Sequence, residues 1–92
     1  MSETKRPTFL EFRAQLKRLT LAQVEAWLKR HGWTRRDEGG GSCWWNPEGS
    51  MGFHLAGERG PIGGWPENLF WQAGRRAGLW PDEVAAEMEA GR

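Results

Sequence analysis

The sequence has little of what builds disulfide, metal or membrane frameworks. Cys43 is the single cysteine in 92 residues, which excludes an internal disulfide and favours the reducing cytoplasm. One cysteine and two histidines cannot close a tetrahedral structural zinc site, so we expect no metal and no other cofactor. No stretch approaches the roughly 18 consecutive apolar residues that span a membrane. Residues 1–5 hold no apolar run, so we expect neither secretion nor a membrane partner.

Tyrosine is also absent, whereas tryptophan and glycine are plentiful. Seven Trp and 13 Gly, most of the glycines between residues 32 and 78, predict rigid apolar surfaces beside tight turns. Hydrophobic residues make up 38% and charged residues 27% of the chain, which is typical of a globular protein rather than a disordered one. A chain of this length buries one modest core, so we predict a single domain.

Charge is balanced over the whole chain but not along it. The formal net charge is +1. Residues 1–36 carry nine Lys and Arg against three Glu, whereas residues 37–92 carry four Arg against nine acidic residues. This asymmetry indicates a basic face for a polyanion and an acidic end. The alternative interpretation is that both sets of charges are solvated helix faces.

Helix signals stand at both ends of the chain. Thr8 with Glu11, and Thr20 with Gln23, form two capping boxes, each followed by apolar residues at helical spacing. Helical patterns return after Pro66 and stop at glycines. We therefore predict an α+β domain with a flexible tail (1–7), helical structure (8–32), strands (33–56), a loop (57–68) and further helical structure (69–90).

Aromatic residues around a Pro/Gly turn predict an antiparallel hairpin over residues 43–56. Residues 47–50 make a four-residue loop, and this loop fixes the register of the two strands. The predicted cross-strand pairs are Cys43 with His54, Trp44 with Phe53, and Trp45 with Gly52.

Alternation along the hairpin separates its two neighbouring tryptophans. Trp44 belongs to the hairpin face that is better suited to the core. We also expect the helical Trp27 and the post-helical Trp33 in the core. Trp45 belongs to the other face. Opposite Gly52, its ring either lies over the glycine or stands free for a ligand.

Three short pieces of sequence carry a resemblance to a known family. They are His31-Gly32-Trp33, the run Gly41-Ser42-Cys43-Trp44-Trp45-Asn46-Pro47, and the run Gln72-Ala73-Gly74-Arg75-Arg76-Ala77-Gly78-Leu79. Their order resembles the HicA-type toxins, small ribonucleases with a fold like that of double-stranded-RNA-binding domains. The resemblance runs from about Leu21 to Met88. It implies such a fold, RNA as the ligand and an antitoxin as a partner.

The resemblance also points to Cys43 and His54 as candidate catalytic residues. The family has a histidine after its Gly-Ser pair, acting in acid/base cleavage of RNA through the 2′-hydroxyl. This chain has Cys43 there, and a thiol, with an ordinary pKa of about 8.5, is a poor substitute for imidazole. The predicted register places His54 across from Cys43. The pair is either a nucleophile with its base or a small buried thiol beside a surface histidine.

Four basic doublets are candidates for phosphate contact. Lys29, Arg30, Arg35 and Arg36 flank one helix end and the following strand, so we expect them to converge on one RNA, with Trp45 available for base stacking. Their alternative role is solubility. Residues 39–42, Gly-Gly-Gly-Ser, resemble a phosphate cradle but lack the Lys-Ser/Thr ending of a P-loop, so a plain turn is the default there.

Two functions of different classes follow from these observations. The first is a HicA-like RNA-binding protein of a toxin–antitoxin system with weakened or lost ribonuclease activity. The second is a non-enzymatic inhibitor or adaptor, of phage or mobile-element origin, that binds a protein partner. In the second case Trp45 and Trp65, which we expect at the tip of the 57–68 loop, are the candidate anchors.

Overall fold

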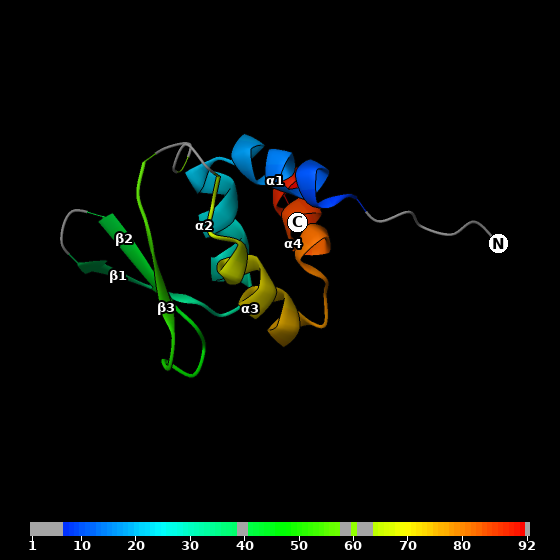
Figure 1. Ribbon diagram of the computed structural model, residues 1–92. Helices are drawn as coiled ribbons and strands as arrows, with labels where there is room; N and C mark the ends of the chain where they lie inside the picture. Colours follow the sequence, from blue (N-terminus) through cyan, green and yellow to red (C-terminus); the bar gives the residue numbers. More distant parts are fainter. Residues whose placement is uncertain (1–6, 39–40, 58–59, 61–63, 92) are drawn as a thin grey trace.

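The computed structural model of the chain describes residues 7–38, 41–57, 60 and 64–91. Its elements are α1 (Phe9–Arg18), α2 (Leu21–Arg30), β1 (Thr34–Glu38), β2 (Gly41–Trp45), β3 (Gly52–Leu55), α3 (Glu67–Ala77) and α4 (Pro81–Ala90). The helices gather on one side and the sheet projects from the other (Figure 1). The predicted α+β class, with helices before and after the sheet, is therefore confirmed.

The two N-terminal helices begin at the predicted capping boxes. The Glu11 backbone N–H donates to Thr8 Oγ1 at 3.2 Å, and the Thr8 N–H donates to Glu11 Oε1 at 3.2 Å. Thr20 and Gln23 repeat the reciprocal pair at 2.9 and 3.3 Å. Each box satisfies N–H groups that a helix start leaves without partners, so the second box starts a new helix.

Helix α2 ends as the glycine predicts. Gly32 has φ +85°, and the Trp33 N–H donates to the Leu28 carbonyl oxygen at 2.9 Å. This is the wider bond of a Schellman ending, and the Gly32 N–H donates to Lys29 O at 3.2 Å as the narrower one. The reversal buries Trp33 and leads the chain into β1.

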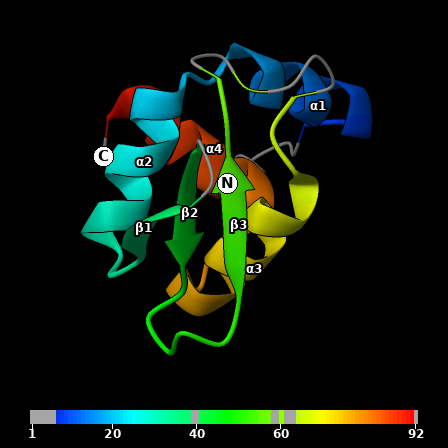
Figure 2. The ribbon, with the colours of Figure 1, turned by 90° about the vertical axis from the view of Figure 1, so that its left-hand side faces the viewer.

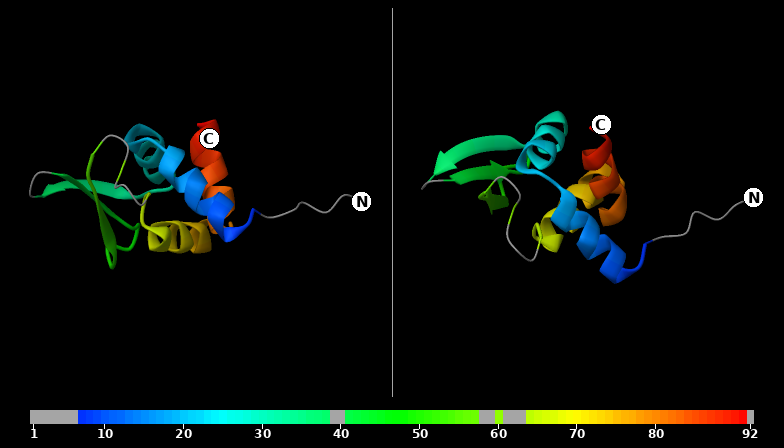
Figure 3. Two further views of the ribbon diagram at one scale, coloured as in Figure 1. Left: turned by 45° about the horizontal axis from the view of Figure 1, so that its top comes forward. Right: turned by 90° about the horizontal axis from the view of Figure 1, so that it is seen from above.

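The three strands form an antiparallel sheet in the order β1, β2, β3. Cys43 pairs with His54, Trp44 with Phe53, and Trp45 with Gly52, so the predicted register is confirmed at every pair. Strand β1 pairs with the other edge of β2. Viewed from above, the end where β1 meets β2 reaches farthest from the helices (Figure 3).

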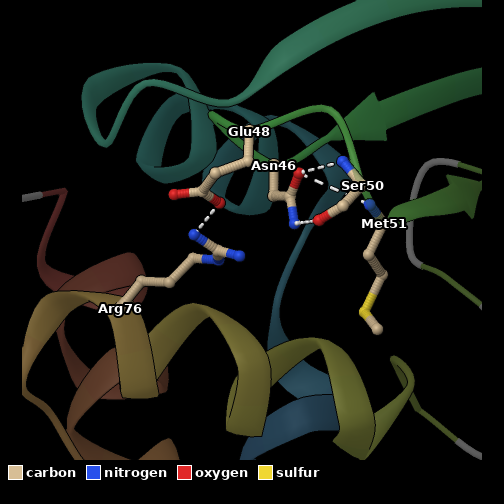
Figure 4. Close-up of polar contacts among 5 residues, drawn as sticks. All are labelled: Asn46, Glu48, Ser50, Met51 and Arg76. Carbon is tan, nitrogen blue, oxygen red and sulfur yellow. Dashed lines mark hydrogen bonds and ion pairs between the residues drawn. The ribbon is translucent and has the colours of Figure 1, made fainter.

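The turn between β2 and β3 is held by Asn46 and tied to α3 (Figure 4). The Asn46 N–H donates to Met51 O at 2.9 Å and closes the four-residue loop. The Asn46 side-chain oxygen accepts the Ser50 N–H at 2.9 Å, which fixes the turn from inside. Glu48, at the tip, forms an ion pair with Arg76 of α3.

One face of the sheet is covered by helices and the other is open. Trp44 and Leu55 point toward the helices and are buried. Figure 2 views the sheet from its open side, with α2 and α3 behind it. The open face carries His54, which is exposed, and Cys43 and Trp45, which are half-buried. The predicted assignment of Trp44 to the core and Trp45 to the other face is thus confirmed.

The prediction that Trp65 is exposed at a loop tip is wrong, because its side chain is 2% exposed and lies in the core. The indole Nε1–H donates to the Leu19 carbonyl oxygen at 2.9 Å, which satisfies an acceptor in the corner between α1 and α2. A Cβ atom at Gly60 would lie 2.7 Å from the ring, so the glycine makes room for the indole. Trp65 is therefore unavailable to a partner.

The C-terminal helices follow the predicted pattern with a small shift. Helix α3 begins at Glu67, two residues before the predicted boundary, because Pro66 precedes its first turn as the N-cap residue. Gly78, at φ +74°, ends it. The Leu79 N–H then donates to Gly74 O at 2.8 Å, and α4 buries Val84, Ala85 and Met88.

Candidate functional site

The open face of the sheet is organised in two rows that cross all three strands. One row is Arg36, Cys43 and His54, and the next is Thr34, Trp45 and Gly52. Residues paired in an antiparallel sheet have Cβ atoms about 4.5–5.5 Å apart, so each row brings its side chains into contact range. The sheet thus places a guanidinium, a thiol and an imidazole side by side.

Trp45 lies flat between a glycine and an arginine. A Cβ atom at Gly52 would lie 2.8–3.1 Å from three atoms of the indole, so the ring rests directly on the glycine. The Arg36 Cζ atom lies 5.4 Å from the ring centroid on the indole. Of the two predicted alternatives for Trp45, the ring over the glycine is the one observed, and Arg36 forms a further layer of the stack.

The Trp45 indole nitrogen is an orphan. Its Nε1 atom is shielded from solvent and has no hydrogen-bond partner among the described residues. A buried donor without an acceptor costs about 1–3 kcal/mol. Trp45 should therefore contribute less to the stability of the fold than a core tryptophan whose N–H group has an acceptor.

Cys43 and His54 face each other across β2 and β3, as the register predicts. The imidazole is exposed and the thiol half-buried. Within the described residues no hydrogen bond joins the thiol to the imidazole, and none orients the imidazole from behind. A nucleophile and base need such a hydrogen bond, with a third group to orient the base. The pair shares a face, but it is not assembled as a catalytic dyad.

The predicted RNA-binding residues divide between the two sides of β1. Lys29 and Arg35 line a cleft of about 390 Å³ on the helix side, with Trp33 and Trp44 among its other walls. Arg36, the next residue along the strand, lies on the open face over Trp45. The two arginines do not share one face of the sheet, because successive strand residues point to opposite faces. That all four basic residues contact one RNA stays a prediction.

Glu25 is the acidic wall of this cleft, and sequence reasoning gave it no role. Its Oε2 atom accepts a hydrogen bond from Ser42 Oγ at 2.8 Å and from Trp44 Nε1 at 2.8 Å. These bonds join α2 to β2 and use the carboxylate within the fold. Both donors are neutral, so the carboxylate keeps its negative charge beside Lys29 and Arg35 in the cleft.

Two other exposed residues were missed by the sequence reasoning. Trp71 and Trp80 are 53% and 51% exposed, and their rings meet edge to face with centroids 6.3 Å apart. Trp71 falls outside the apolar stripe of α3, formed by Leu69, Phe70 and Ala73. That spacing was the available signal for its exposure.

The described residues offer neither a group of metal ligands nor a membrane-spanning helix. These residues contain no group of three or more His, Cys, Asp or Glu side chains placed to hold a metal ion. Their helices include none that is long and apolar enough to cross a membrane. The glycines of the predicted phosphate cradle at residues 39 and 40 lie outside the described residues.

Comparisons with protein-family models, with curated proteins and with solved structures find no match to this chain. The resemblance to the HicA-type toxins therefore stays a prediction.

Proposed function

We propose that the protein binds RNA along the edge strand β1 and cleaves it slowly or not at all. The observation that carries the proposal is the stack of Gly52, Trp45 and Arg36 on the open face of the sheet. In sequence-specific RNA recognition, unpaired bases stack on aromatic rings and on planar guanidinium groups. Arg36, which lies over the indole, offers such a group.

The support beneath Arg36 matters for affinity. A free arginine side chain has many rotamers, and ordering it on binding costs about 0.5–1.5 kcal/mol. Trp45 already orders the guanidinium, and Gly52 holds Trp45 from below. A base that stacks on Arg36 therefore meets a surface that is largely prepared. His54 lies on β3 in the same row as Arg36, and its imidazole supplies a donor or acceptor for a 2′-hydroxyl.

Phosphate contacts fall to the other side of the same strand. Lys29 and Arg30 lie in the last turn of α2, and Arg35 lines the cleft beside Lys29. An RNA strand that crosses the edge of the sheet would place a base over Arg36 and its phosphates toward these three cations. Residues on the open face of β1 would thus contact bases, and basic residues on its helix side would contact phosphates.

The order of elements also supports the proposal. Helix α2, three antiparallel strands and helix α3, with the helices on one face, follow the order that the family resemblance implies. In a toxin–antitoxin system the natural partner of such a protein would be an antitoxin. The alternative of a protein-binding adaptor loses Trp65, which is buried, as one of its two predicted anchors.

Binding is tested by fluorescence anisotropy with a labelled RNA hairpin that has a single-stranded loop. Base stacking is worth about 1–3 kcal/mol, so Arg36→Ala should weaken binding about tenfold. Arg35→Ala should lower the slope of log affinity against log salt by about 1. Lys17→Ala, which removes a positive charge from the exposed surface of α1, is the matched control.

The binding proposal fails if the wild type does not bind the hairpin at low salt. It also fails if Lys17→Ala and Arg36→Ala weaken binding equally, because the effect would then be one of total charge. A fully paired duplex of the same length should bind less tightly than the hairpin, since it has no unpaired base to stack.

Cleavage is tested on the same RNA by gel electrophoresis. General acid/base catalysis contributes about 10²–10⁴-fold, and Cys43 stands where the family that the chain resembles has a histidine. Cys43→His should therefore raise the cleavage rate, and His54→Ala should abolish any residual activity of the wild type. Robust cleavage by the wild type that neither substitution changes would place the active site elsewhere.

A further inference from the structure

A second surface, distant from the open face of the sheet, is apolar. The large hydrophobic side chains exposed among the described residues are Phe9, Leu10, Trp71 and Trp80, with exposed fractions of 51–77%. Phe9 and Leu10 begin α1, Trp71 lies in α3, and Trp80 is the N-cap residue of α4. The starts of α1 and α4 lie on the side away from the sheet (Figure 1). Exposed apolar patches of this kind mark interaction sites.

The two tryptophans are the shared wall of two adjoining hollows. The first hollow, of about 430 Å³, is lined by Trp71, Trp80, Leu79 and Arg75 among others. The second, of about 180 Å³, is lined by the same two tryptophans with Phe9 and Asp82. The two hollows and the tryptophan pair between them are called the Trp71/Trp80 groove.

Hydrogen bonds hold the backbone on both sides of Trp80. The Leu79 N–H donates to Gly74 O at 2.8 Å, and the Trp80 N–H donates to Glu83 Oε1 at 2.8 Å. A Cβ atom at Gly74 would lie 2.6 Å from Leu79 O, so the glycine permits this close approach. A backbone that is already held in place loses little entropy on binding, which favours Trp80 as an interface anchor.

The charges along the groove identify its partner. Arg75 lines only the first hollow, whereas Asp82 and Glu67, which is paired with Arg13, line only the second. A uniformly acidic or uniformly basic partner would meet a like charge at one end. A second copy related by a two-fold axis meets opposite charges at both ends, because Arg75 of each copy faces Asp82 of the other. We infer that the Trp71/Trp80 groove is the interface of a homodimer of this chain.

The dimer should be reversible. Four exposed side chains and their surroundings make a small interface, and small interfaces dissociate on dilution. The inference is independent of RNA binding, since the groove shares no residue with the open face of the sheet.

Sedimentation equilibrium of the full chain over a wide concentration range tests the inference. The wild type should pass from monomer to dimer as concentration rises, and Trp71→Ser should remain monomeric. Arg75→Glu and Asp82→Arg should each weaken the dimer at least about tenfold, because a two-fold interface contains each pair twice. Combining both substitutions in one chain restores opposite charges at both ends and should restore the dimer.

The matched control is Lys17→Glu, which reverses an exposed charge on α1 outside the groove and should leave the dimer intact. Circular dichroism of each variant checks that it is folded. A monomeric wild type at every concentration overturns the inference. So does a charge-swapped double variant no better than the single variants, because that result fits a different partner or a different face.

Discussion

Trp45 and Trp65, one on the open face of the sheet and one in the helical core, lie against glycines in the same way. A Cβ atom at Gly52 would lie 2.8 Å from the Trp45 ring, and one at Gly60 would lie 2.7 Å from the Trp65 ring. Their indole N–H groups differ. That of Trp65 donates to Leu19 O, whereas that of Trp45 has no partner among the described residues.

This difference separates a tryptophan that stabilises the fold from one that the fold merely supports. Trp65 buries its whole ring and satisfies its polar atom, so both terms favour the folded state. Trp45 buries part of its ring and leaves its donor unpaired. A residue retained at such a cost fits a binding surface better than a core.

The largest effect expected from this comparison is on Trp65. Replacing a fully buried aromatic side chain with alanine costs about 3–5 kcal/mol, and Trp65→Ala also leaves the Leu19 carbonyl without its donor. Trp45→Ala should cost clearly less, because it also removes an unpaired N–H group. Urea unfolding followed by circular dichroism measures both. Equal losses of unfolding free energy for the two variants would refute the distinction.

The glycines beneath the two rings give the next effect. Gly60 has φ +73°, so Gly60→Ala pays roughly 1–2 kcal/mol for a left-handed backbone and roughly 1–3 kcal/mol for displacing the Trp65 ring. Gly52→Ala should lower the free energy of unfolding only through displacement of Trp45, which can shift toward solvent. Gly49→Ala is the matched control, since Gly49 has φ +72° with no heavy atom near its added Cβ.

Thermal or urea unfolding should therefore rank Gly60→Ala as the most destabilising of the three. If Gly49→Ala costs as much as Gly60→Ala, backbone strain accounts for the whole effect and the contact with Trp65 adds nothing.

The hairpin was predictable because its information is local. A four-residue loop closing on Asn46 fixes every later pair, and the alternation of Trp44 and Trp45 then assigns the two faces. The helix starts were predictable for the same reason, since each capping box lies within four residues. The burial of Trp65 was not predictable, because it depends on contacts with Leu19 and Gly60. These contacts depend on how the preceding loop folds back on the helices.

The faces on which Arg35 and Arg36 lie were not predicted, for a different reason. Arg35 and Arg36 are adjacent in a polar strand, and period-2 alternation sends them to opposite faces. With no apolar stripe in β1 to mark the core side, their closeness in sequence suggested one surface. Trp71 could have been identified as exposed, because it falls outside the apolar stripe of α3. Trp80 lies between two helices, where no periodicity applies.

The smallest expected effect is the coupling between Arg36 and Trp45, and it is the most direct test of the stack. A cation–π contact near the protein surface contributes about 0.5–1 kcal/mol. In a double-mutant cycle of Arg36→Ala, Trp45→Ala and the double variant, the coupling free energy of unfolding should fall in that range. Arg36→Lys should lose part of it, because an ammonium group cannot stack flat on the ring.

The same cycle measured on RNA affinity should give a larger coupling. Removing Trp45 withdraws the support that holds the Arg36 plane for a base, so each single substitution should cost nearly as much binding as the double one. Additive losses in affinity would mean that the two side chains contact RNA separately. In that case the layered arrangement of Gly52, Trp45 and Arg36 would be a feature of sheet packing alone.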